Sequence, residues 1–311
     1  MKKFVLNLIK MLLGLSVAYI ICLPIFYRSP INGHLMFSRG GYGHMYSRLE
    51  ELEKLNKQNL LFLGSSHTYR NFDTQFFKSN GLKSFNLGSS SQSPDVTGIL
   101  ISEYLSKLSP KLVIYEVYPE IIFSQRLESR IDIISNLRIS RLPSVMNFTS
   151  SSIGEFNTMI LSFWHQIVNS EFKEDRYKGQ DIYIDGGYVR NENIRTQFDL
   201  SIKSLSIDLE NAGFENLKQN IEYIQEFGSQ IVLVYAPLPS DTYSLYKAQN
   251  NTIDSLYSSL GVPYINYNGI PLNDTLHFKD DDHLNHAGVQ IFNQRLLKDL
   301  DSLSVLDVDI H

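Results

Sequence analysis

Residues 60–67 read LLFLGSSH, and the prediction of the fold starts from them. A short apolar run that ends at a glycine is typical of a strand buried on both faces of a sheet. Four more apolar runs follow at residues 84–87, 112–115, 231–235 and 262–265. Segments with the spacing of amphipathic helices lie at residues 96–108, 215–227, 241–260 and 287–300. This alternation predicts an α/β protein, namely a three-layer α/β/α sandwich with a central parallel sheet of the flavodoxin-like kind.

The composition excludes some classes of protein. The chain has 311 residues, of which 43% are hydrophobic and 20% are charged, so it can build the core of one large domain. Its net charge of -5 and the lack of a basic stripe argue against a nucleic-acid partner. The single cysteine, Cys22, cannot form an internal disulfide.

The N-terminus has the pattern of a membrane anchor. Residues 4–27 are mostly apolar and are long enough to span a bilayer. Lysines at positions 2, 3 and 10 predict a cytoplasmic N-terminus. We therefore expect a single-pass signal anchor over residues 1–27 and a catalytic domain outside the cytoplasm, periplasmic or at the cell surface. A cleaved signal peptide is the alternative, although Pro24, Phe26 and Tyr27 stand where small residues would precede a cleavage site.

The remaining chain divides into three parts. Residues 28–58 are expected to form a juxtamembrane linker, and residues 59–311 the α/β domain. Residues 120–210 interrupt the strand-and-helix alternation and are interpreted as an insertion. The insertion is either a lid or substrate platform, or ordinary helical decoration.

The turn at residues 64–67 offers a nucleophile. A serine directly after a buried strand presents its hydroxyl at the carboxyl edge of the sheet, where ligands bind in parallel α/β folds. The backbone N–H of such a serine can also help to stabilise an oxyanion. Helix capping by the serine is the alternative interpretation.

A base for this nucleophile stands near the C-terminus. Asp280 and His283 are three residues apart, just before the last expected helix. A histidine can accept the proton of a serine hydroxyl, and a carboxylate on its other ring nitrogen fixes the tautomer. The alternatives are an acidic loop that caps the helix, or a cation site made by three adjacent aspartates.

Together these segments resemble the SGNH (GDSL-type) hydrolase superfamily. Its first motif is Gly-Asp-Ser, and Gly64-Ser65-Ser66 departs from it by one residue. The alignment implies Ser66 as the nucleophile, with Ser65 as the alternative. The glycine of the second motif, an oxyanion-hole donor, corresponds to Gly88, and the final Asp-x-x-His corresponds to Asp280 and His283. The resemblance covers residues 59–118 and 229–300 and implies no metal and no organic cofactor.

The third motif, Gly-x-Asn-Asp, is missing, because the corresponding strand runs into Glu116 and Pro119. Gln92 could replace the missing donor, and Glu116 is expected to pair with an arginine. Departures of this kind beside an N-terminal anchor are similar to the SGNH-like proteins of cell-envelope modification. The resemblance implies transfer or removal of an O-acyl group, such as acetyl, on a cell-envelope glycan or polymer, with a membrane-bound acyl-donor protein as a possible partner.

Three further residues have candidate roles. Tyr183 and Tyr188 are candidates for stacking on sugar rings, and His67 for a structural role beside the nucleophile. The alternative for the whole chain is a catalytically inactive SGNH-like module that binds glycan or an acyltransferase in the membrane. A Rossmann-type nucleotide site is disfavoured, because residues 64–67 lack its glycine pattern.

Overall fold

The computed structural model describes residues 1–26, 37–41, 43–124, 127–146, 152–168, 171–196 and 207–306. The chain forms two compact units. The first comprises residues 1–39 and 130–172, and the second comprises residues 40–129 and 173–311. The second unit contains the sheet and is described first.

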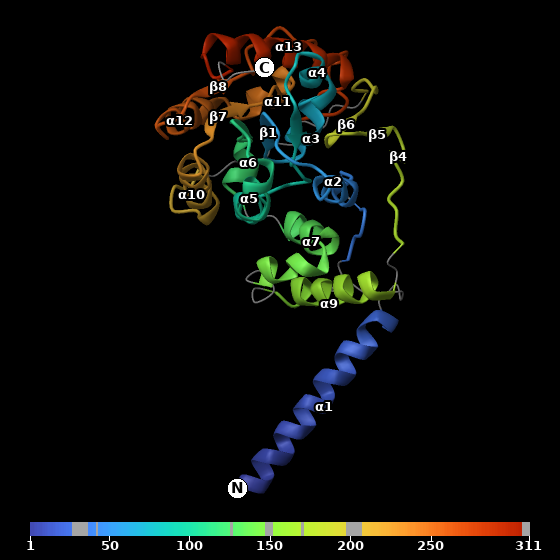
Figure 1. The fold of residues 1–311 in the computed structure, drawn as a ribbon. Coiled ribbons are helices and arrows are strands. Elements are labelled where there is room, and N and C mark those ends of the chain that lie inside the picture. Colours follow the sequence, from blue (N-terminus) through green and yellow to red (C-terminus); the bar gives the residue numbers. More distant parts are fainter. Residues whose placement is uncertain are drawn as a thin grey trace. The chain divides into compact units, whose positions relative to one another are not determined.

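The core of the second unit is a five-stranded parallel sheet (Figure 1). Its strands are β1 (Leu60–Leu63), β2 (Ser84–Asn86), β3 (Leu112–Glu116), β7 (Gln230–Tyr235) and β8 (Tyr264–Asn266). They pair in the order β2-β1-β3-β7-β8, which is the flavodoxin-like order with its switch point between β1 and β3. The predicted strands and the predicted fold class are therefore confirmed.

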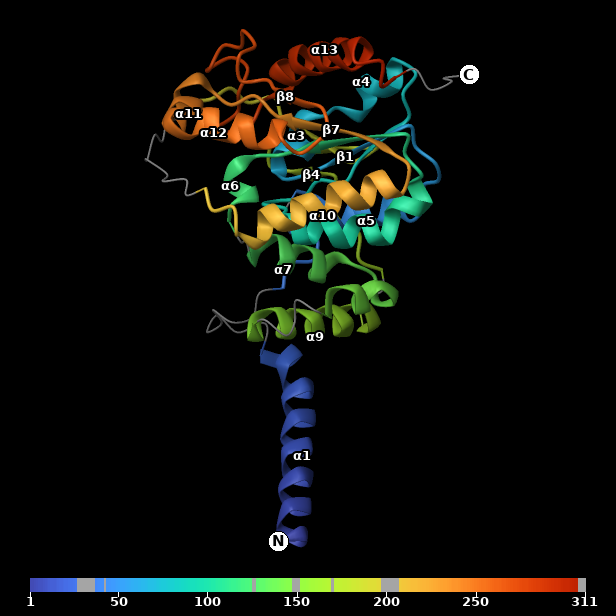
Figure 2. The ribbon, with the colours of Figure 1, turned by 90° about the vertical axis from the view of Figure 1, so that its left-hand side faces the viewer.

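Helices cover both faces of the sheet (Figure 2). On one face Phe62 and Ile114 pack against Phe292 of α13 (His286–Ser302) and Phe77 of α4 (Thr74–Ser79). On the other face lie α5 (Pro94–Leu108) and α10 (Ala212–Glu226). There the Asn220 amide donates to the Tyr115 hydroxyl over 3.2 Å and to the carbonyl of Pro94 over 2.7 Å. The side chains alternate between the faces because a strand has a period of two residues.

Shorter helices complete this unit: α3 (Ser66–Asn71), α6 (Pro119–Ile122), α11 (Ser240–Leu245) and α12 (Lys247–Ser258). The single helix expected over residues 241–260 is two helices. They meet at Tyr246, whose φ of -98° and ψ of 11° are not helical. Its buried ring is held there by a hydrogen bond from its hydroxyl to Glu120.

The second half of the expected linker at residues 28–58 contains a helix that packs into the second unit. Helix α2 (Met45–Leu52) buries its apolar side chains in the second unit, and the guanidinium of Arg48 donates to the carbonyl of Gly187 over 2.9 Å. A helix with this much burial is part of the fold rather than a tether. Residues 27–36 and residue 42 lie outside the described residues.

The predicted insertion contributes to both units. Its helical part contains α7 (Leu127–Asn136), the 3₁₀ segment η1 (Ile139–Val145) and α9 (Ile153–Val168). Its second part is an antiparallel sheet of β4 (Tyr177–Lys178), β5 (Asp181–Ile184) and β6 (Tyr188–Arg190), which belongs to the second unit. Residues 197–206 of the insertion lie outside the described residues.

Helix α1 (Lys2–Phe26) belongs to the first unit. Among the described residues it is the one helix that is long and apolar enough to cross a membrane. Only 6% of its most apolar stretch of 18 residues is buried. An anchor and a signal sequence both fit this finding.

Candidate active site

The nucleophile turn lies at the carboxyl end of β1. Gly64 has a φ of +131°, and a Cβ there would lie 2.5 Å from Thr68 Oγ1 and 2.7 Å from the carbonyl oxygen of Glu116. Ser65 caps α3, since its Oγ accepts from the backbone N–H of His67 over 3.3 Å. Ser66 is the first residue of α3 and is half-buried. Because the chain turns directly from strand to helix, the Ser66 side chain is presented at the edge of the sheet.

Ser66, His283 and Asp280 come together as predicted. His283 Nε2 lies 2.8 Å from Ser66 Oγ, and His283 Nδ1 lies 3.0 and 3.1 Å from the two carboxylate oxygens of Asp280. The same carboxylate accepts the backbone N–H of His283 over 2.8 Å, which holds the loop closed. Nucleophile, base and orienting acid therefore stand in hydrogen-bonding sequence, which is the arrangement that activates a serine hydroxyl.

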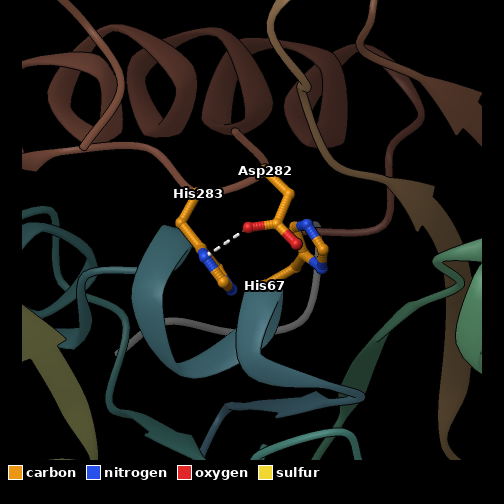
Figure 3. A group of neighbouring side chains, drawn as sticks. All are labelled: His67, Asp282 and His283. Atoms are coloured by element: carbon orange, nitrogen blue, oxygen red, sulfur yellow. Dashed lines mark ion pairs between the residues drawn. The ribbon is translucent and has the colours of Figure 1, made fainter. Parts of the chain in front are cut away.

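A second carboxylate also faces His283. Asp282 Oδ1 forms an ion pair with His283 Nδ1 at 2.7 Å, and Figure 3 shows the Asp282 carboxylate between the rings of His283 and His67. The two imidazoles are stacked, with centroids 4.9 Å apart. Since a ring nitrogen carries one proton, Asp280 and Asp282 compete for it.

These charges set the protonation of the two histidines. Burial disfavours the imidazolium of His283, but the carboxylates of Asp282 and Asp280 outweigh it and raise the pKa of His283 to about 9. For His67, burial and the charge of His283 lower the pKa to about 4. His67 is therefore neutral under conditions in which His283 can carry a proton.

Asp281, between the two acids, anchors the loop. Its carboxylate accepts from Arg195 Nε over 2.8 Å, and Arg195 also pairs with Asp241 at 2.9 Å. The hydroxyl of Thr242 donates to the carbonyl of Asp281 over 2.7 Å. Sequence reasoning missed Arg195, which is 1% exposed, because a lone arginine in the irregular insertion has no motif to mark it.

Among the described residues, Glu116 has no arginine partner, which differs from the expectation. Its Oε2 accepts from Ser65 Oγ over 2.9 Å and from the Ser65 N–H over 3.4 Å. The side chain is 2% exposed, and burial raises the pKa of Glu116 to about 8, although the Ser65 hydrogen bonds oppose the rise. Glu116 thus supports the residue next to the nucleophile and is mostly protonated near neutral pH.

Of the two predicted oxyanion donors, Ser66 and Gly88, the second differs from the prediction. The N–H of Ser66 has no hydrogen-bond partner among the described residues and is available. Gly88 lies beside the nucleophile turn, where a Cβ would be 2.9 Å from the carbonyl oxygen of Ser65, but its N–H donates to Asn86 Oδ1 over 3.1 Å. The assignment of Gly88 as a free donor is therefore corrected: a glycine is needed there because the backbone of Ser65 approaches it closely.

In the next turn, the N–H groups of Ser90 and Ser91 lack partners within the described part of the chain, and Ser91 has a φ of 48°.

The three predicted substrate-binding residues are buried. Gln92 is 2% exposed and donates to Thr97 Oγ1 over 2.9 Å. Tyr183 is 6% exposed with its hydroxyl on Glu51, and Tyr188 is 1% exposed with its hydroxyl 3.1 Å from His286 Nδ1. In this conformation neither tyrosine presents the open ring face that stacking on a sugar requires, and the Gln92 amide is engaged within the fold.

A cation could be held by one group of side chains at this site. Ligand atoms of His67, Asp282 and His283 all lie within 4.8 Å of one another (Figure 3). One nitrogen of His67, Nε2, is buried without a hydrogen-bond partner among the described residues. A cation bound there would occupy the imidazole that faces Ser66.

Comparisons with known proteins find similar structures. A GDSL-like lipase from Bacteroides thetaiotaomicron has a TM-score of 0.42 and 14% identity, over 84% of this chain and 98% of that chain. A lipase/acylhydrolase from Enterococcus faecalis has a TM-score of 0.39 and 11% identity, over 80% and 97%. No protein-family model and no curated protein sequence matches the chain. At this level of similarity, the function has to be argued from the side chains of the site.

Proposed function

We propose that the chain is a serine esterase or acyltransferase of the SGNH type. One observation carries the proposal: Ser66 Oγ lies 2.8 Å from His283 Nε2, and the opposite nitrogen of that ring is bound to Asp280. A serine that only caps a helix does not need a hydrogen bond to a histidine that is itself bound to a carboxylate. It is the arrangement required for nucleophilic attack on an acyl carbonyl.

The reaction follows from these contacts. His283 Nε2 accepts the hydroxyl proton as Ser66 Oγ bonds to the acyl carbon, and the N–H of Ser66 donates to the resulting oxyanion. The intermediate collapses to acyl-Ser66 as the leaving alkoxide takes the proton from His283. Water or an acceptor hydroxyl then gives its proton to His283 and attacks the acyl carbon. The second intermediate collapses as Ser66 Oγ leaves and takes that proton back from His283. No step needs a metal or an organic cofactor.

The test is labelling with a fluorophosphonate, which reacts with activated serines. The wild-type chain should be labelled, and Ser66→Ala should lose labelling together with activity on the order of 10⁴-fold or more. Ser65→Ala is the matched control, because it removes a neighbouring hydroxyl that bonds to Glu116 rather than to the base. Labelling that survives in Ser66→Ala and is lost in Ser65→Ala would transfer the nucleophile to Ser65.

A catalytically inactive binding module remains the second candidate. The observation in its favour is the occupied N–H of Gly88, which leaves the oxyanion site with fewer free donors than expected. Removal of one such donor costs an enzyme about 100- to 1,000-fold in turnover. An unlabelled but folded wild-type chain would favour this candidate.

We further propose an O-acylated cell-envelope glycan as substrate, with acetyl as the acyl group and a membrane-bound protein as acyl donor. The support is the membrane-anchor pattern of α1, which would hold the site at an envelope surface. The experiment supplies the purified chain with an activated acetyl ester, with and without glycan oligomers. Acetylated glycan that accumulates faster than free acetate would identify transfer, and acetate release that no glycan diverts would identify hydrolysis.

A further inference from the structure

A helix that packs on a protein core buries its apolar side and exposes its polar side. Helix α9 does the reverse. Its large apolar side chains point outward and are between 39% and 66% exposed: Ile153, Phe156, Phe163, Trp164, Ile167 and Val168. Its buried side is small or polar apart from one leucine: Gly154, Glu155, Asn157, Thr158, Leu161 and Ser162. The exposed residues recur at helical spacing, so they form one continuous apolar face.

Hydrogen bonds and an ion pair within the first unit hold α9 in this orientation. Glu155 pairs with Arg130 at 3.4 Å. Gln166 donates to the carbonyl of Leu137 over 2.9 Å and accepts from the N–H of Ile139 over 2.8 Å. Rotation of α9 to bury its apolar face would break these contacts and leave polar groups unpaired, which is costly. The outward apolar face is therefore a built feature of this unit.

The neighbour of α9 is the helix with the composition of a membrane span. The hydroxyl of Tyr19 in α1 donates to Asn157 Oδ1 of α9 over 2.6 Å, and Figures 1 and 2 both show α9 across the C-terminal end of α1. The apolar span ends at Ile25, six residues after Tyr19, which is about 9 Å of helix rise. Amphipathic helices that lie on a bilayer are buried about 5–10 Å below its boundary.

We propose that α9 lies in the membrane leaflet at the C-terminal end of α1, with its apolar face toward the lipid. Lipid fits this face better than another protein does for two reasons. The face belongs to the helix that the candidate membrane span contacts through Tyr19, and none of its six large exposed side chains is charged. Trp164 stands where amphipathic aromatic rings are enriched, at the membrane–water interface. The inference rests on retention of α1 in the bilayer and not on the proposed chemistry.

The test uses the native fluorescence of the full chain, because Trp164 is its only tryptophan. The protein is reconstituted in vesicles of phosphatidylcholine and phosphatidylglycerol, with or without brominated acyl chains. We expect blue-shifted emission, quenching by bromine at the 6,7 positions more than at the 11,12 positions, and protection from iodide. Quenching by iodide without quenching by bromolipid would overturn the proposal, and so would protection from both, which would indicate a protein cover such as a second copy.

Two variants sharpen the experiment. Trp164→Phe combined with Tyr223→Trp moves the fluorophore to α10, where position 223 is 43% exposed, and should be quenched by iodide alone. Phe163→Ser combined with Ile167→Ser should leave the chain bound to vesicles but expose Trp164 to iodide. Flotation with the vesicles is measured in parallel. A chain that floats while its wild-type Trp164 faces water overturns the interfacial helix, whereas a chain that fails to float overturns the retained anchor on which it depends.

Discussion

At the scale of single residues, His283 lies between two carboxylates with different surroundings. Asp280 accepts two backbone N–H groups besides the ring, from Asp282 and His283. Asp282 has the shorter contact to Nδ1, at 2.7 Å, but its carboxylate also faces His67. We therefore assign orientation of the ring to Asp280 and an additional electrostatic effect to Asp282.

This assignment predicts different pH profiles for two variants. The base must be unprotonated, so kcat/KM of the wild type should rise along a limb set by the His283 pKa of about 9. Asp282→Asn removes a nearby negative charge, which lowers the pKa of His283 and should move the limb to lower pH by about one unit or more. Asp280→Asn also removes a charge that raises this pKa, so it should move the limb as well, but in addition it should reduce turnover about 10³- to 10⁴-fold at every pH, because the ring loses its orientation.

The measurement is kcat/KM against pH with a chromogenic acetate ester. Asp281→Asn is the control, since Asp281 binds Arg195 and not the ring; its effect should appear in stability more than in the pH profile. If Asp282→Asn abolished turnover and Asp280→Asn only shifted the limb, the roles of the two acids would be exchanged.

The raised pKa of Glu116 predicts that the free energy of unfolding depends on pH. Its pKa is about 8 in the folded chain against an ordinary value of 4.5, so the folded state keeps a proton that the unfolded chain has released. Stability contributed by this proton is complete below pH 4.5 and is lost as pH rises to about 8. Glu116→Gln cannot ionise but can still accept from Ser65, and should therefore lose less stability between pH 6 and pH 9.

Urea unfolding in detergent at both pH values tests this prediction. The control is Glu222→Gln on the exposed surface of α10, which should track the wild type. Equal losses in the wild type and in Glu116→Gln would show that Glu116 is not protonated in the folded state near neutral pH.

At the scale of elements, α3 is the most constrained helix of the site. It has six residues, too few to be stable alone. Arg70, in its last turn, forms two hydrogen bonds of 2.9 and 2.7 Å with the carboxylate of Asp181 in β5. The small sheet of the insertion thus braces the helix that carries Ser66.

Loss of the pair between Arg70 and Asp181 should lower the stability of the fold measurably. Arg70→Met should lower the free energy of unfolding by about 2 kcal/mol, because a largely buried, charge-assisted pair is lost and Asp181 keeps its charge. Arg295→Met removes a pair to Asp299 on the exposed side of α13 and should have a smaller effect on stability, because solvent screens an exposed pair. Urea unfolding of both variants makes the comparison, and equal effects would mean that the Arg70 pair is screened like a surface pair.

At the scale of the whole molecule, the second unit supplies all the residues of the proposed chemistry. Ser66, Asp280 and His283 belong to it, as do the residues that hold them. The first unit contains α1 and α9. The proposed division of labour is therefore chemistry in one unit and membrane attachment in the other.

Membrane attachment gives a topological prediction. The chain beyond residue 27 should lie outside the cytoplasm and stay with the membrane, since lysines flank the N-terminal side of the apolar span. Alkaline phosphatase fused after His311 should be active, and green fluorescent protein fused there through the same export route should be dark. Release of the fusion in soluble form would indicate cleavage of α1, and a bright fluorescent fusion would contradict the orientation.

Much of the fold could be read from local sequence. The apolar runs predicted all five strands, because a strand covered on both faces needs little more than short apolar runs and terminal turns. Gly64 and the serines after it predicted the turn, since a crowded strand-to-helix connection needs a glycine. The Asp-x-x-His spacing predicted the base, because a carboxylate three residues before a histidine can reach its ring within one turn.

The remaining features depend on contacts between distant residues, and only the tertiary structure decided them. Ser65 meets Glu116 across 51 residues, Arg70 meets Asp181 across 111, and Tyr183 meets Glu51 across 132. Each partner could have been replaced by many others without a change in local pattern, so no spacing in the sequence marks the pair. Composition and spacing determined the layers and marked Ser66 and His283 as the candidate nucleophile and base. Burial and hydrogen bonding between separate elements decided which donors stay free and which aromatic rings face the solvent, because these depend on what packs against each group in three dimensions.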